Sequence, residues 1–255
     1  MSDILSGVVL QLRLFRRVPG NLLIFMTVPF FSLIFLSAAR SHGDHVVSPR
    51  EILAPVLMGF WLVGCQIAEM VVSYERAYGT LEIIVAAPAR FTWVVTGRVL
   101  TVALLGIVTL LEVIVMSRVA FGIAVTVYHP TVFILGLLAT ILASAGTSTI
   151  MTAVFLAVRG ARRYVNTLGY PFYILAGVLV PITFLPSPLR PLADPIYLYW
   201  SGNVLYGSLG RASIRDPELS LVMIVLLACA SYAAGNLLIR KVIDRMRASG
   251  EIGLG

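Results

Sequence analysis

Charged side chains are scarce in this sequence. They make up 12% of its 255 residues, whereas soluble domains have about 25%. Hydrophobic residues account for 59%, and the mean hydropathy is +0.95. So few charges cannot cover the surface of a water-soluble protein of this size, and we therefore predict an integral membrane protein.

Lysine, cysteine and histidine are also few, and each shortage excludes a class of chemistry. The single lysine, Lys241, follows Arg240 and not glycine, so the G-x-x-x-x-G-K-[ST] loop that binds ATP is absent. Cys65 and Cys229 both lie in apolar runs, which excludes a disulfide framework. The three histidines form no H-E-x-x-H motif, the pattern typical of a zinc enzyme. We expect this chain to bind no metal or cofactor and to have no enzymatic activity of its own.

Six apolar runs are long enough to cross a membrane, which takes about 20 residues as a helix. They cover residues 21–39, 52–74, 92–117, 131–158, 164–184 and 219–239. Four runs carry no charge, but the second contains Glu69 and the third contains Arg98 and Glu112. The pattern predicts an all-α membrane protein in which residues 1–255 form a single domain with six transmembrane helices.

Basic residues are divided unequally between the two sides of these runs. One side has 13 lysines and arginines and the other has 6, and the richer side is expected in the cytoplasm. Both termini are then cytoplasmic, and topology explains the net charge of +7 without a nucleic-acid partner. The preference for arginine over lysine is typical of a GC-rich bacterial genome, so we expect a multi-pass protein of a bacterial inner (plasma) membrane.

Three further segments do not span. Residues 1–18 have helical apolar spacing and basic residues towards their end, which predicts an amphipathic helix on the inner membrane surface. Residues 75–90, ERAYGTLEIIVAAPAR, favour a short cytoplasmic helix closed by Pro88. Residues 186–216 are rich in Tyr, Trp and Gly, which indicates an outer re-entrant hairpin with Tyr197 and Trp200 at the headgroup level.

Polar residues inside the predicted spans are candidate functional groups, because they are costly in a membrane. Glu69 shares a helix face with Gln66 and Ser73, and Glu112 lies in the outer half of the third span. Each carboxylate could border a conduit or an interface, or make a structural hydrogen bond within the bundle. The fourth span carries a patch of small residues that favours close helix packing over binding. Its members are Ser144, Gly146, Thr147, Ser148, Thr149 and Thr152.

The cytoplasmic segment carries a motif that resembles a known family. Glu75-Arg76-x-x-Gly79-Thr80-Leu81-Glu82, followed by Pro88, is similar to the signature after the second span of type 2 ATP-binding cassette (ABC) exporter permeases. A second stretch resembles the same family, although Asp194 stands where the family more often has Asn. It consists of Ala176-Gly177, Pro181, Pro186 and Pro191-Leu192-Ala193-Asp194-Pro195-Ile196-Tyr197.

The resemblance implies a membrane subunit that works with other proteins. Its partners would be two separate ABC ATPase subunits, which bind ATP and Mg, and a second permease, identical or related, within membrane lipid. Residues 75–87 would dock on an ATPase, with Glu75, Arg76 and Glu82 offering charge-assisted contacts and Gly79 a tight turn.

The implied cargo is a hydrophobic or amphipathic substrate, such as a drug, antibiotic or lipid, and export would fit multidrug or antibiotic resistance. Two alternatives stay open. The cytoplasmic charges could merely solvate a loop and bind headgroups. The chain could also be an ATP-independent secondary carrier or a membrane scaffold, although it shows no internal repeat of the kind that carriers have.

Overall fold

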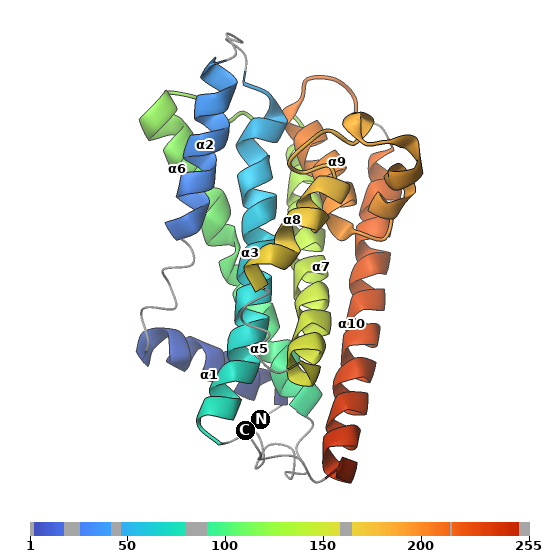
Figure 1. The fold of residues 1–255 in the computed structure, drawn as a ribbon. Coiled ribbons are helices and arrows are strands. Elements are labelled where there is room, and N and C mark those ends of the chain that lie inside the picture. Colours follow the sequence, from blue (N-terminus) through green and yellow to red (C-terminus); the bar gives the residue numbers. More distant parts are fainter. Residues whose placement is uncertain are drawn as a thin grey trace.

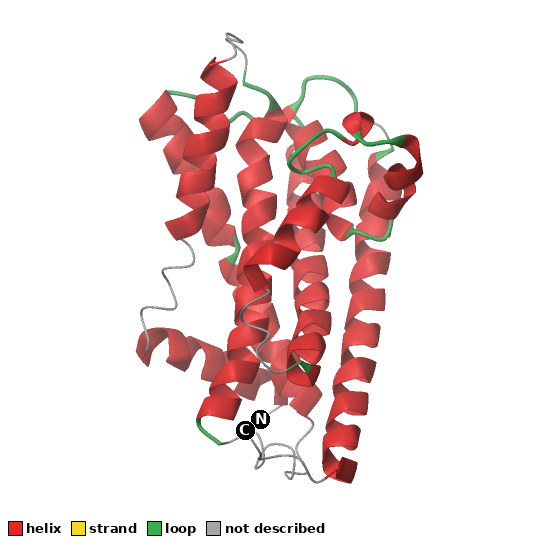
Figure 2. Cartoon of the chain, in the orientation of Figure 1, coloured by secondary structure: helices red, strands yellow, loops and turns green. Residues whose placement is uncertain are grey.

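The computed structural model describes residues 3–17, 26–41, 47–79, 91–158, 165–214 and 216–249. Within these ranges, helices are joined by turns and loops, and no strand occurs (Figures 1 and 2). The helices are α1 (Asp3–Arg17), α2 (Thr27–Ser41), α3 (Pro49–Ala77), α5 (Phe91–Leu105), α6 (Ile107–Phe121), α7 (Pro130–Ala157), α8 (Val165–Leu175), α9 (Tyr197–Leu209) and α10 (Pro217–Ser249), with 3-10 turns η3 (Ile182–Phe184) and η4 (Ser187–Ala193).

Four helical stretches are long and apolar enough to cross a membrane. They are Pro49–Ala77, Trp93–Phe121, Pro130–Ala157 and Pro217–Ala248, and a shorter apolar helix covers Thr27–Ala38. The predicted all-α class is therefore confirmed, and the four stretches are consistent with a membrane protein. The beginning of the predicted first span lies outside the described residues, which resume at Met26.

Two predicted spans differ from uninterrupted helices. The third consists of α5 and α6, which meet at Gly106, where an added Cβ would come within 2.5 Å of the Phe60 ring. The fifth, predicted over 164–184, is shorter, because α8 ends at Leu175. Gly177 follows with φ of +72°. The amide of Val178 donates to the carbonyl of Tyr173, so a left-handed glycine turn ends this helix where its hydropathy alone would continue it.

Helix α3 lies at the centre of the bundle, and 72% of its most apolar 18-residue window is buried, against 22% for α10. It starts in a capping box, in which the Ser48 side chain accepts from the Glu51 amide and the Glu51 carboxylate accepts from the Ser48 amide. The small residues of α7 allow close packing: an added Cβ at Gly146 would lie 2.9 Å from the Ala228 carbonyl on α10. The expected packing role of this patch is confirmed.

The two ends of the bundle differ in structure. Helix α1 lies crosswise at the end of the bundle where α3 ends and α5 begins, and it packs against α5 (Figure 1). The opposite end holds α9 and the two 3-10 turns, and there α9 packs against α3, α7 and α10. The chain thus gathers the predicted interfacial helix, α1, and the start of the predicted coupling segment at one end.

Candidate functional site

A buried ion pair joins three helices at the α1 end of the bundle. Arg98 of α5 lies 3.0 Å through Nη1 from Oε1 of Glu75, in the last turn of α3. The Nε of Arg98 also donates to Oε1 of Gln11 on α1, at 3.1 Å. The side chain of Arg98 is 2% exposed and that of Glu75 is 15% exposed. We call Gln11, Arg98 and Glu75 the polar junction.

Glycines permit the close crossing of α1 and α5 beside this junction. An added Cβ at Gly7 would come within 2.2 Å of the Val94 carbonyl oxygen, and one at Gly97 within 2.1 Å of the Ile4 carbonyl oxygen. Real Cβ atoms do not approach backbone so closely, so each position admits only glycine unless the helices separate. The crossing brings Gln11 within hydrogen-bonding distance of Arg98.

Arg76, the neighbour of Glu75, turns to a different helix. Its Nη2 donates to the carbonyl of Leu156 at 2.7 Å, and its Nη1 to that of Val158 at 3.4 Å. Both carbonyls lie at the C-terminal end of α7, where backbone oxygens lack helical partners and the helix dipole attracts a cation. The end of α3 is therefore fastened to α5 and α1 on one side and to α7 on the other.

The intramembrane carboxylates lie apart from this junction. Glu69 is 3% exposed and accepts a hydrogen bond from the Ser73 hydroxyl one turn later, as their shared face predicts. Gln66 is half-buried on the same helix. Glu112 is partly buried on α6, and its Oε2 has no hydrogen-bond partner among the described residues. The structure does not bring Glu69 and Glu112 together into one pair.

In the predicted outer hairpin, the aromatic residues have two different environments. Trp200 donates through Nε1 to the Asp194 carbonyl at 2.9 Å, while Asp194 and Pro195 are exposed. Tyr197 is only 3% exposed, and its ring lies 6.4 Å from that of Trp61 on α3. Its ring is therefore packed inside the bundle, because α9 turns this face inward, and its place at the headgroup level stays a prediction.

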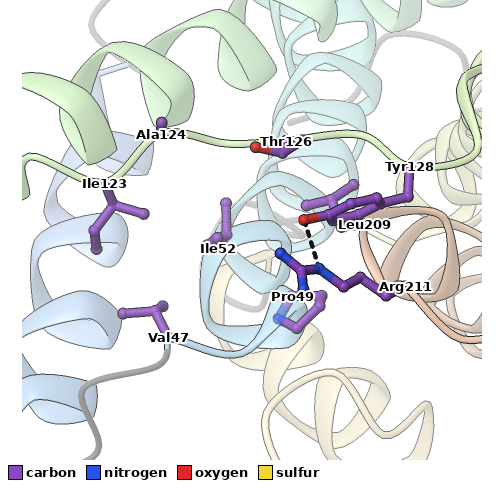
Figure 3. Close-up of a pocket in the computed structure, with 10 residues that line it drawn as sticks. Val47, Pro49, Ile52, Ile123, Ala124, Thr126, Tyr128, Leu209 and Arg211 are labelled. Atoms are coloured by element: carbon purple, nitrogen blue, oxygen red, sulfur yellow. Dashed lines mark hydrogen bonds between the residues drawn. The ribbon is translucent and has the colours of Figure 1, made fainter.

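A cavity of about 650 Å³ opens between α3, the segment that joins α6 to α7, and the end of α9 (Figure 3). Its described lining is mainly apolar, with Val47, Ile52, Ile123 and Leu209 among the walls. Arg211 is the charged residue of that lining. Its Nε donates to the Tyr128 hydroxyl at 2.9 Å, and this hydrogen bond raises the pKa of Arg211 above its usual value. The arrangement can hold an apolar group beside a permanent positive charge.

No group of three or more metal-binding side chains occurs within the described ranges. A comparison with protein-family models finds the ABC-2 type transporter model, which matches residues 9–209. The chain belongs to the ABC-2 type transporter family. None of the curated proteins matches it.

Family membership makes the chain a transmembrane permease subunit, as its resemblance implied. An ABC-2 membrane domain is a permease and not a nucleotide-binding domain, which agrees with the missing ATP-binding loop. In general, an ABC-2 permease pairs with ATPase subunits and with another permease. The matched range includes the polar junction from Gln11 to Arg98 and all of α9.

The ABC-2 chain places its predicted coupling residues in two environments. Glu75 and Arg76 belong to the last turn of α3 and make the contacts described above, rather than opening a separate helix. Gly79 is in the following turn with φ of +65°, and nothing lies within 4 Å of an added Cβ there. Thr80, Leu81, Glu82 and Pro88 lie outside the described residues. Docking of this segment on an ATPase stays a prediction.

Sequence reasoning on this ABC-2 permease missed the roles of Gln11 and Arg98. Arg98 was visible as a charge inside an apolar run, and a charge in such a place requires a partner. The partner could not be read from local spacing, since Gln11 and Arg98 are 87 positions apart. Gln11 gave no signal beyond its place on an amphipathic helix.

Proposed function

We propose that this ABC-2 permease exports a hydrophobic or amphipathic substrate, such as a drug, antibiotic or lipid. The energy comes from ATP hydrolysis on two separate ATPase subunits, which hold ATP and Mg, and a second permease, identical or related, completes the conduit. The complex works in the inner membrane of a bacterium. Export from the cytoplasm or inner leaflet is consistent with a role in drug or antibiotic resistance.

In the proposed topology, the end of the bundle that holds α1 and the polar junction faces the cytoplasm. The 13 to 6 distribution of basic residues favours this orientation. Arg13, Arg16 and Arg17 are exposed on α1, where they would meet anionic headgroups. The chain then crosses the membrane six times. The four long stretches make four of the crossings, and α2 and the segment from α8 to η3 make the other two.

The observation that carries the proposal is the anchoring of the motif at the end of α3. Glu75 and Arg76 open the family-like motif, and their side chains hold α5 and α7. A displacement of residues 78–90 by an ATPase would therefore act on several helices at once. A scaffold or an ion-coupled carrier has no need for a cytoplasmic segment that is fastened in this way.

The test is copurification of the tagged chain from its native membrane, followed by reconstitution in vesicles. We expect an ATPase subunit to copurify and to hydrolyse ATP, and we expect a screen of apolar compounds and lipids to find compounds that stimulate it. A chain that transports with no ATPase present, or that recruits none, would support the carrier or scaffold reading instead. A catalytically inactive ATPase is the matched control, since it should assemble with the chain without driving transport.

A further inference from the structure

We propose that Arg98 is a positioning residue that makes α1 move together with the end of α3 during transport. The inference rests on the proposed function, because it describes how movement of the coupling segment reaches the interfacial helix. It assigns a working role to α1, which is otherwise a membrane-surface helix.

The first step is that Arg98 must keep its partners. A guanidinium that is 2% exposed has no water to replace a lost contact, and an unpaired buried charge is strongly unfavourable. Glu75 and Gln11 supply a carboxylate and an amide oxygen at 3.0 and 3.1 Å. Any conformation that leaves Arg98 buried therefore keeps α1 and the end of α3 attached to α5.

The second step is that the α1 and α5 backbones fit against each other with little freedom. Gly7 faces the Val94 carbonyl and Gly97 faces the Ile4 carbonyl, so the two helices contact each other through backbone on both sides of the crossing. Contacts of this type tolerate little sliding, because a small shift brings atoms into overlap. The α1 and α5 pair is thus suited to move as one body.

The third step concerns the other face of α1. Leu5, Leu10 and Leu12 are 47%, 39% and 45% exposed, while Gly7, Gln11 and Phe15 form the stripe that is buried in the bundle. An amphipathic helix with exposed leucines and arginines lies in the lipid interface. Movement of α1 therefore displaces inner-leaflet lipid at the position where an amphipathic substrate would enter.

The contacts of Arg76 permit a selective test. Arg76 holds α7, and Glu75 connects to α1 through Arg98, so loss of the polar junction should release α1 but leave the α3 and α7 connection. Gln11→Leu removes the hydrogen bond between α1 and Arg98, but it keeps the ion pair and the close packing of α1 on α5. Arg98→Gln removes both the hydrogen bond and the ion pair. In the double variant Glu75→Arg, Arg98→Glu, the Gln11 amide can turn to donate to the new carboxylate, so the junction should be restored.

The experiment measures two distances by spin labelling in the complex with its ATPase, with Cys229→Ser as the background. One label pair, at Leu5 and Leu237, reports α1, and the other, at Tyr78 and Leu237, reports the end of α3; all three side chains are exposed. In the wild type, both distances should change between the nucleotide-free state and the state trapped with ATP and vanadate.

In Arg98→Gln, the α1 distance change should fall to less than about a quarter of the wild-type change, while the change at Tyr78 persists. Gln11→Leu keeps the ion pair and the close packing of α1 on α5, so it should retain at least about half of the α1 change. The charge-exchanged double variant should recover at least about half of the α1 change. Arg247→Gln is the control, because Arg247 pairs with Asp244 on the exposed end of α10, and it should behave as the wild type.

An α1 that moves fully in Arg98→Gln, or that stays fixed in the wild type while Tyr78 moves, would overturn the inference. If Arg98→Gln does not fold, Glu75→Gln, which breaks the same ion pair, and the double variant decide. Failure of the proposed function has a different signature, since no ATPase would be present to change either distance. The junction is then tested on the chain alone, where Arg98→Gln, but not Arg247→Gln, should speed amide exchange in α1 about tenfold or more.

Discussion

At the scale of single residues, the end of α3 shows how neighbours in sequence can serve opposite sides of a bundle. Successive residues of a helix point about 100° apart, so Glu75 is directed to α5 and Arg76 to α7. A sequence reader sees two adjacent charges in a polar stretch and assigns both to an outside partner. The structure gives each an internal partner, and both contacts are charge-assisted.

Glycine has two different roles in this protein, and one pair of substitutions separates them. Gly97→Ala would place a Cβ within 2.1 Å of the Ile4 carbonyl, and such overpacking costs about 1–3 kcal/mol. We expect α1 to detach, which faster amide exchange in α1 would reveal. Gly79 has open space around it but a φ of +65°. Gly79→Asn should therefore be nearly neutral, since Asn tolerates this conformation, and α1 exchange should not change.

The reverse result is informative as well. Slow exchange in α1 of the Gly97→Ala variant would show that the two helices can separate slightly at little cost. The close backbone contact would then not be what holds α1 in place, and the Gln11 contact would carry that role alone.

The candidate site could be predicted from sequence only where its partners are local. Glu69 and Ser73 are one helical turn apart, so their shared face was predictable and the hydrogen bond forms. Glu75 and Arg98 are 23 positions apart, and the contact depends on how α3 and α5 pack. No periodicity encodes that packing. The burial of Tyr197 could not be predicted for the same reason, because it depends on the face that α9 presents to α3.

At the scale of elements, apolar runs predicted the long helices well. The runs 52–74 and 219–239 lie within α3 and α10, and these helices extend beyond their runs because capping and polar turns add to them. The run 131–158 matches α7 to within one residue at each end. Hydropathy does not register backbone breaks, however. Gly106 divides α5 from α6, and Gly177 follows the end of α8, although the apolar composition continues through both.

The segment that follows α3 carries the sharpest element-scale prediction. Glu82→Arg should leave folding and membrane insertion intact but weaken binding of the ATPase, by about 2–5 kcal/mol if the contact is desolvated. Affinity capture of the ATPase by the tagged permease measures the loss. Asp244→Arg is the control, because it reverses an acidic charge that is 72% exposed on α10, where substitutions usually change stability by less than about 0.5 kcal/mol. Unchanged ATPase binding by Glu82→Arg would count against the coupling role of residues 75–87.

At the scale of the whole molecule, the proposed orientation can be tested with a pair of exposed positions. Ser213 lies in the connection from α9 to α10, and Ala248 lies at the far end of α10, so one long helix separates them. In a background without the exposed Cys229, Ser213→Cys should react with an impermeant thiol reagent outside intact cells, and Ala248→Cys only after lysis. Labelling of Ala248→Cys in intact cells would invert the topology, despite the basic-residue distribution.

Assembly with a second permease is the remaining prediction at this scale. Helix α2 exposes Phe30 and Ile34, and α8 exposes Tyr170 and Ile174, so the regions of the first and fifth spans both have apolar surface left over by their own bundle. If they meet a second, identical chain, Ile34→Cys or Ile174→Cys should form an oxidative crosslink between two copies in membranes. The native Cys229 is exposed on α10 and serves as the control that should not crosslink. Crosslinking at Cys229 alone would move the interface to α10. If two differently tagged copies never copurify, the second permease is not a copy of this chain. If no other permease copurifies either, the chain works without a permease partner, which would contradict the proposal.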